Sequence, residues 1–340
     1  MSGAGQSKVG AGLLLALLAL VAVWLALANS RWQSAWARNR GFVAFNTFLA
    51  ANAAPTPSAG GRPDMAARAA TQLERAVRLD PQPASPWRAL GYAHLAAGDM
   101  DAAVAAWQHW PNMVAELIAN GDRAAAASRA EEAFDWYRRA TVVDPTDPAG
   151  WLALGQAHED NGDWPSAEQT YRAGIDAQTA ATLVNSDLHF RLARVYASWP
   201  QPVDYAAVLA AADQAIQSDH FIHDWSRVQS HYLRGVALES LGRKQAALTE
   251  FRQVIDQVAE PYWPLVHLGR LTWELEGDAT AAEGYLRAAL DANDSNKWAY
   301  LALAEVYWNT GRRAAAAELY RAVLRLDERD PTALSRLGEQ

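Results

Sequence analysis

The 340-residue chain contains no cysteine. This absence excludes disulfide bonds, thiolate metal sites and a cysteine nucleophile. Lysine is scarce too, with only Lys8, Lys244 and Lys297 among 30 basic residues. The sequence also lacks a serine elbow, a phosphate-binding loop and a paired-metal motif. We therefore expect no cofactor and no metal, and predict that the protein is not an enzyme.

Basic charge is in deficit over most of the chain. From residue 41 onward there are 26 basic residues against 38 acidic ones, a net charge of −12. A surface of that sign repels phosphate backbones, which excludes nucleic acid as a partner. Hydrophobic residues make up 51% of the chain and charged residues 20%, a balance typical of a folded protein.

Residues 11–28 form an uncharged apolar run, "AGLLLALLALVAVWLALA". As a helix this run would extend roughly 27 Å, close to the thickness of a bilayer's hydrocarbon core. After a tail of residues 1–10, the sequence thus predicts a transmembrane helix or signal anchor over residues 11–30 that contacts the lipid bilayer. A cleaved signal peptide is the alternative, since Lys8 precedes the run and Ala26-Leu27-Ala28 ends it. We expect a single-pass membrane protein whose folded domain is extracytoplasmic rather than cytoplasmic.

The next residues, 31–64, separate this run from the folded domain. Apolar residues at helical spacing (Phe42, Phe45, Phe48 and Leu49) predict a juxtamembrane helix, and "APTPSAGGRPD" over residues 54–64 predicts a linker. An amphipathic stretch follows and stops at Asp80-Pro81, where proline disfavours a continuing helix.

From there a pattern of small and aromatic residues repeats. A glycine or alanine recurs at intervals of 30 to 42 residues, at Gly91, Gly121, Gly155, Ala193, Gly235, Gly269, Ala304 and Gly338. Sixteen positions after most of them stands an aromatic residue: Trp107, Tyr137, Tyr171, Phe251, Tyr285 or Tyr320. Twelve positions after most of them stands an alanine: Ala103, Ala133, Ala167, Ala247, Ala281 or Ala316. The pattern resembles the tetratricopeptide repeat, a helix-turn-helix unit of 34 residues.

Two units depart from the pattern. In residues 114–147, "ANGDRAAAASRAEEA" leaves open whether a helix or a turn contains Gly121. In residues 186–227, "SWPQPVD" is interpreted as an insertion between the two helices. If the insertion is three residues long, Val208, Ala212 and Ala215 take the core positions.

The resemblance implies an all-α, right-handed α-solenoid of about seven helix-turn-helix repeats over residues 65–340, preceded by one transmembrane helix. Since one repeat cannot bury its own apolar face, the signature residues form a core shared between stacked units. In this family the first helix of each unit lines a concave groove. Carried over position by position, the predicted partner-binding residues are Arg88, Tyr92, Gln156, Glu159, Phe190, Arg194, Tyr232, Glu239, Trp263, Arg270, Trp273, Trp298, Glu305 and Trp308.

Aromatic and arginine side chains dominate this set, as they do in protein interfaces. We therefore expect a scaffold that binds a partner protein or peptide in its groove. The partner is expected in the same membrane or envelope, and the role is expected to be assembly of the envelope or of a membrane complex. A regulatory or substrate-presenting module for a membrane glycan-processing enzyme remains an alternative. A third is self-association through the C-terminal end, where "PTALSRLGEQ" over residues 331–340, which contains Gly338, begins another first helix that is cut short. The cluster His220, His223, Asp224 and His231 is interpreted as helix-capping and connecting residues rather than a metal site.

Overall fold

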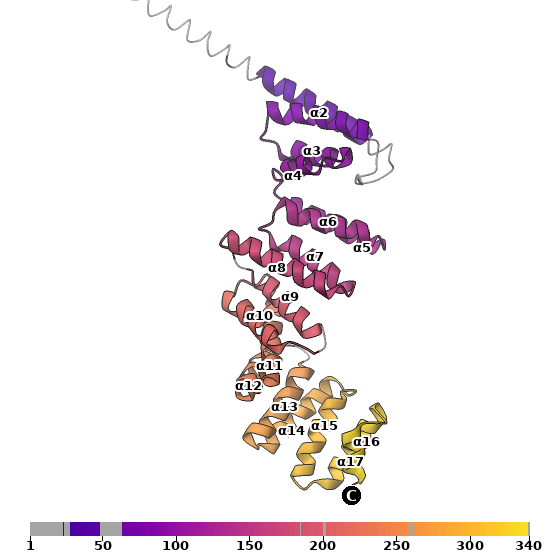
Figure 1. Ribbon diagram of the computed structural model, residues 1–340, viewed down its shortest axis with the longest axis vertical. Coiled ribbons are helices and arrows are strands. Elements are labelled where there is room, and N and C mark those ends of the chain that lie inside the picture. The colour runs from indigo at the N-terminus through magenta and orange to yellow at the C-terminus, as the bar shows by residue number, and fades with distance from the viewer. Residues whose placement is uncertain are drawn as a thin grey trace, which may run out of the picture. The chain divides into compact units, whose positions relative to one another are not determined.

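The computed structural model describes residues 23, 28–47, 63–183, 185–199, 202–258 and 261–338. These residues form helices joined by short turns, and none of them belongs to a β-strand. Figure 1 shows the helices following one another in chain order. The predicted all-α helical-repeat solenoid is confirmed.

A first helix covers residues 28–47. The helices after it, in chain order from α2 to α17, are Pro63–Leu79, Ala84–Ala97, Met100–Trp107, Met113–Ala126, Ala130–Val143, Pro148–Asp160, Trp164–Ala180, Ser186–Ser198, Tyr205–Ser218, Asp224–Ser240, Lys244–Ile255, Tyr262–Glu276, Ala279–Ala292, Lys297–Asn309, Arg313–Leu326 and Pro331–Gly338.

The chain divides into two compact units, Met1–Gly150 and Trp151–Gln340. Within each unit the described helices pack mainly against elements one or two steps away in the chain. In the second unit, for example, α9 packs against α10 and α11, and α13 packs against α14 and α15. Each core is therefore built between consecutive helices, as expected for a repeat protein.

Residues 28–47 pack against α2 in the first unit. Gly41 lies so close to α2 that a Cβ added to it would fall 2.6 Å from Leu73 Cγ. Ala37 and Phe45 are buried, and the Ser34 hydroxyl donates a hydrogen bond of 3.4 Å to the Ala76 carbonyl. The two helices form the first pair of the stack. The predicted linker over residues 54–64 lies almost entirely outside the described residues.

The predicted membrane span over residues 11–30 also lies almost entirely outside the described residues. In the part of the chain that the structure describes, no helix combines the length and the apolar character needed to cross a bilayer. The single-pass membrane localisation expected from the sequence is thus corrected, since no helix of the described residues supports it.

Tight packing between a glycine and an aromatic ring explains the repeating pattern. In α7, a Cβ added to Gly155 would fall 2.2 Å from Tyr171 Cε1, so that only glycine admits the ring. Tyr171 and Ala167 on α8 are fully buried. Between the helices Gly162 adopts a φ of 72°, and the Asp163 carboxylate accepts a hydrogen bond of 3.2 Å from the Ser166 amide. The signature residues of this repeat are core, as predicted.

The helix positions answer the questions that the sequence left open in the two irregular units. Helix α5 runs through Gly121, so a turn there is excluded, and the chain reverses instead near Ser128, whose φ is 58°. In the unit with the insertion, α10 buries Val208, Ala212 and Ala215. The three-residue shift predicted for that unit is confirmed.

One repeat has a register that the sequence pattern misplaces. The residues packed against Gly269 are Leu286 and Ala282, which are fully buried, whereas the predicted core residues Tyr285 and Ala281 are partly exposed. The cause is one extra residue in α13, which ends at Glu276: its C-cap Gly277 follows Gly269 by eight positions, whereas Gly162 follows Gly155 by seven. The position of this turn glycine is the signal that reveals the shift.

Candidate functional site

In the first unit, the predicted groove residues are engaged with one another. Arg88 on α3 donates two hydrogen bonds of 2.6 Å to the two carboxylate oxygens of Glu116 on α5. The Tyr92 hydroxyl donates to the same carboxylate at 2.6 Å, and the Tyr92 side chain is buried. Although burial alone would raise the pKa of Glu116, the hydrogen bonds from Arg88 and Tyr92 hold it below its usual value. This network links α3 to α5 and leaves Tyr92 inaccessible to a partner.

The predicted residues on α7 and α9 also face inward. Glu159 is buried and accepts hydrogen bonds from the Tyr171 hydroxyl and from Arg194. Phe190 is 2% exposed, and the half-buried Gln156 donates to Asp160 at 3.2 Å. The prediction of Tyr92, Glu159 and Phe190 as groove residues is corrected by their burial: they hold helices together.

The predicted aromatic residues on α13 and α15 converge on one cavity. Its volume is about 480 Å³, and its wall is mostly apolar. Trp263, Trp273 and Trp298 line it together with Val266 and Leu301, all in the second unit. Trp263 is 37% exposed and Trp298 is 55% exposed, whereas Trp273 is half-buried. We name this site the tryptophan cavity.

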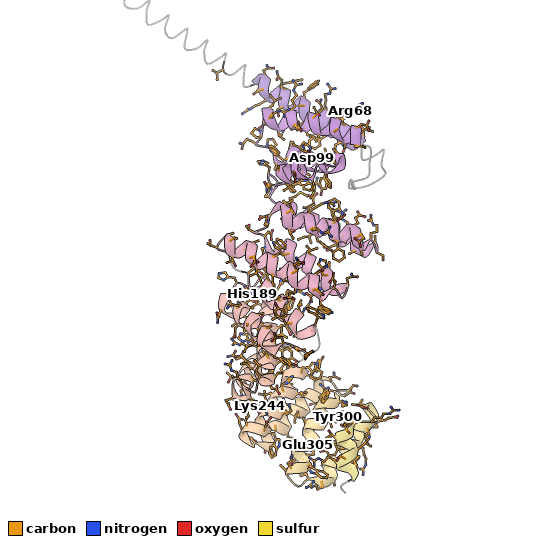
Figure 2. The ribbon with its side chains drawn as sticks, in the orientation of Figure 1. Arg68, Asp99, His189, Lys244, Tyr300 and Glu305 are labelled. Carbon is orange, nitrogen blue, oxygen red and sulfur yellow. The ribbon has the colours of Figure 1, made fainter. Side chains whose placement is uncertain are left out.

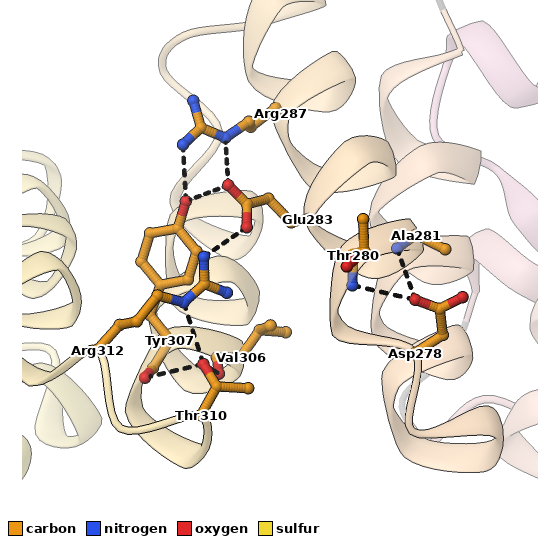
Figure 3. Close-up of polar contacts among 9 residues, drawn as sticks. All are labelled: Asp278, Thr280, Ala281, Glu283, Arg287, Val306, Tyr307, Thr310 and Arg312. Atoms are coloured by element: carbon orange, nitrogen blue, oxygen red, sulfur yellow. Dashed lines mark hydrogen bonds and ion pairs between the residues drawn. The ribbon is translucent and has the colours of Figure 1, made fainter.

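A helix cap and a carboxylate shared between helices position this site. The Asn296 carboxamide oxygen accepts hydrogen bonds from the Trp298 and Ala299 amides and starts α15. Glu283 on α14 accepts hydrogen bonds from the Tyr307 hydroxyl at 2.6 Å and from Arg312 at 2.6 Å, which ties α14 to α15 and to the turn that follows (Figure 3). These contacts fix the helix that presents Trp298 to the cavity.

The charged groups at one side of the cavity are paired within the protein. Arg270 forms an ion pair with Glu239 on α11 and lies 3.6 Å from Glu274 on its own helix. Burial lowers the Arg270 pKa. His267 stacks on Phe251 with ring centroids 4.7 Å apart, and its Nδ1 lies 2.7 Å from Glu239. Burial lowers the His267 pKa to about 4, so its imidazole is neutral at pH 7.

A second paired carboxylate lies on α15, at the other side of the cavity. Glu305, labelled in Figure 2, accepts a hydrogen bond of 2.6 Å from the Tyr320 hydroxyl and two of 3.1 Å from Arg336. Near it the predicted groove residue Trp308 is only 7% exposed, covered by the guanidinium groups of Arg313 and Arg336. Trp308 is thus a core residue and does not line the cavity.

The structure therefore brings five predicted residues together at the tryptophan cavity: Trp263, Arg270, Trp273, Trp298 and Glu305. Of the other predicted residues, Glu239 forms an ion pair with Arg270, and Tyr232 lines an adjoining cavity. Four further lining residues were not predicted from the sequence. His267 and Thr332 line the tryptophan cavity, and Trp225 and Tyr262 line the neighbouring cavities. Tyr262 next to Trp263 at the start of a first helix is the signal that would have identified it.

The histidine cluster of the irregular connection does not converge. His231 Nδ1 lies 2.8 Å from Glu250, whereas His223 stacks on Trp225 at the start of α11. No group of three or more His, Asp or Glu side chains that could hold a metal ion occurs among the described residues.

Comparison with known proteins agrees with this architecture of paired helices. Three family models, each described as tetratricopeptide repeat, match residues 66–108 and 116–182, residues 228–257, and residues 275–338. Together they cover more than half of the chain. The fold is thus that of an α-helical repeat protein, and the chain carries tetratricopeptide repeats. A comparison with curated proteins gives no match.

Several solved structures share the fold at low sequence identity. Pseudomonas aeruginosa pilF is 15% identical, with a TM-score of 0.55 over 67% of this chain and 98% of that chain. PilW, a widely conserved type IV pilus biogenesis factor, is 12% identical, with a TM-score of 0.50 over 66% of this chain and 98% of that chain. The APC/C hetero-tetramer Cut9-Hcn1 is 14% identical with a TM-score of 0.49 over 81% of this chain. This chain spans 52% of that one.

Proposed function

We propose that the chain is a protein-interaction scaffold that binds a segment of a partner protein at the tryptophan cavity. The observation that supports it is the convergence of Trp263, Trp273 and Trp298 on one apolar cavity of about 480 Å³. Exposed tryptophans in a concave, mostly apolar site are typical of the few residues that dominate the binding energy of an interface. The tetratricopeptide fold supports the same class of function.

We also propose that the chain acts by binding rather than by catalysis. The charged groups that line the cavity, Arg270 and Glu305, are held by ion pairs to Glu239 and Arg336. Groups engaged in this way orient and neutralise one another, whereas a catalytic acid, base or nucleophile must reach its substrate. In this proposal the role of the chain is to hold a partner during assembly of a larger complex.

Affinity capture with matched tryptophan variants tests the scaffold. The purified full-length chain is the bait, compared with Trp263→Ala/Trp298→Ala and with Trp32→Ala, a control at a side chain 76% exposed outside the cavity. A captured protein is then purified and its affinity is measured directly. We expect a partner that binds the wild type and Trp32→Ala equally and the double variant at least about tenfold more weakly. The proposal would be overturned if every captured protein bound the double variant as tightly as the wild type while the unfolding temperature of the double variant matched that of the wild type.

A further inference from the structure

Shared wall residues link the tryptophan cavity, directly or through a neighbour, to two further cavities of the second unit. One of about 520 Å³ has Trp225, Gln229 and Val258 in its wall, and one of about 170 Å³ lies between it and the tryptophan cavity. Gln229 and Val258 line both the large and the small one, and Trp263 lines both the small one and the tryptophan cavity. The three form one track along α11, α13 and α15, which suits an elongated ligand.

Aromatic rings are present along the whole track. They are Trp225, Tyr232, Tyr262, Trp263, Trp273 and Trp298. Grooves lined in this way recognise proline-rich segments, because a polyproline II helix fits between aromatic rings and is already ordered before it binds. Such a ligand loses little conformational entropy on binding.

Most charged side chains of the track are paired within the protein, and the exposed Asp224 at the end formed by the large cavity is the exception among the described residues. Arg270 is paired with Glu239, Glu305 with Arg336, and Arg227 at the large cavity with Asp219 at 3.1 Å. A charged segment would have to displace one of these partners and leave its charge uncompensated in a partly desolvated site. The track therefore favours an uncharged segment.

The tryptophan cavity offers indole N–H groups as hydrogen-bond donors. The indole N–H groups of Trp263, Trp273 and Trp298 form no hydrogen bond with another residue that the structure describes. The Glu305 carboxylate already accepts from Arg336 and Tyr320. A proline-rich segment presents backbone carbonyl groups as acceptors and has few N–H groups to satisfy, so it matches these donors, whereas an extended strand needs both donors and acceptors.

We propose, resting on the scaffold function above, that this track binds an uncharged proline-rich segment in the polyproline II conformation. The proline rings stack on the aromatic side chains, and the carbonyl groups accept hydrogen bonds from the tryptophan indoles. Trp298 is the anchor most accessible to the ligand because its side chain is 55% exposed.

Titration of the full-length chain with synthetic peptides tests this ligand class. The probe is a short acetylated and amidated peptide of repeated Pro-Pro-Leu, and binding is followed by calorimetry. The comparison peptides carry alanine in place of each proline, or glutamates at both ends. We expect the proline peptide to bind most tightly, with an affinity that changes less than about twofold between about 0.05 and 0.5 M salt.

Two double variants separate the contribution of the aromatic ring from that of its N–H donor, and Trp32→Ala is the control. Trp263→Ala/Trp298→Ala is expected to lower the affinity for the proline peptide at least about tenfold. Trp263→Phe/Trp298→Phe, which keeps an aromatic ring at each position, is expected to lower it about a few-fold. Trp32→Ala should leave the affinity unchanged. Equal binding of the alanine peptide, tighter binding of the glutamate peptide, or tryptophan-dependent binding of a soluble glucan in place of the peptide would overturn the inference.

The two proposals fail in different ways. A purified partner that depends on Trp263 and Trp298, combined with no binding of the proline peptide, refutes the ligand class and leaves the scaffold standing. A proline peptide bound with the same affinity by wild type and Trp263→Ala/Trp298→Ala refutes this site for the peptide, and the scaffold proposal fails only if the captured partner also binds both proteins equally.

Discussion

Gly155 and the ring of Tyr171 lie in direct contact across two helices, with no room for even one methyl group between them. Replacement Gly155→Ala is therefore expected to lower the free energy of unfolding by about 1–3 kcal/mol, since overpacking outweighs the better helix propensity of alanine. Denaturant unfolding measures the change.

Gly284 in α14 provides the matched control. It is exposed, and a Cβ added there meets nothing within 4 Å. Gly284→Ala should stabilise the protein by up to about 1 kcal/mol. Equal effects of the two substitutions would contradict the close packing at Gly155.

Replacing Trp308 is expected to affect mainly stability, whereas replacing Trp298 is expected to affect mainly partner binding. Trp308 is buried beneath two arginines, so Trp308→Ala is expected to cost about 3–5 kcal/mol of stability. Trp298→Ala, at an exposed ring, should change stability by less than about 1 kcal/mol while weakening partner binding. Thermal unfolding together with affinity measurement checks both, and a folded, fully stable Trp308→Ala protein would show that Trp308 is not core.

The buried carboxylate of Glu159 compensates two arginines. Glu159→Gln keeps the shape but leaves Arg194 and Arg191, which lie against that carboxylate, without their counter-charge. We expect a loss of about 3 kcal/mol, typical of breaking a buried pair. In the surface pair of Arg321 with Glu318, which is 72% exposed, Glu318→Gln should change stability by less than about 1 kcal/mol. A similar small effect at Glu159 would show that its ion pairs contribute little.

The buried imidazole of His267 makes stability depend on pH. Because burial lowers its folded pKa to about 4, below the unfolded value of about 6.5, the unfolded chain binds the extra proton first as pH falls. Stability is therefore complete above about pH 6.5 and decreases toward pH 4, by up to about 3 kcal/mol. His267→Phe should flatten this part of the profile, as measured by denaturant unfolding at several pH values. An unchanged slope would assign the acid sensitivity to other groups.

Much of the core could be predicted from the sequence because its pattern is periodic. Tyr171, Phe251 and Tyr320 each stand sixteen positions after a small residue, and all three are fully buried. The pattern failed at Gly269 because one inserted residue moves every later side chain of the repeat to a new position on its helix.

The binding surface could be predicted only in part. Position on the first helix identified Trp263 and Trp298, but it also selected Phe190 and Trp308, which are buried. Whether such a side chain is exposed depends on what the next elements place over it. Trp225 packs edge-on against Phe190, and Arg313 and Arg336 cover Trp308. Trp225 and Arg336 are distant in sequence from the side chains they contact, so spacing alone does not reveal these contacts.

Packing mainly between consecutive helices has a mechanical consequence for the second unit. Helix α17 is held by α16 and, through Arg336, by Glu305 on α15. A pulling force on the C-terminus would act on these contacts before it reached those between α11 and α12. In single-molecule stretching, we expect extension in successive increments that begin at the C-terminal helices, so the tryptophan cavity would open before the cores nearer to Trp151 yield.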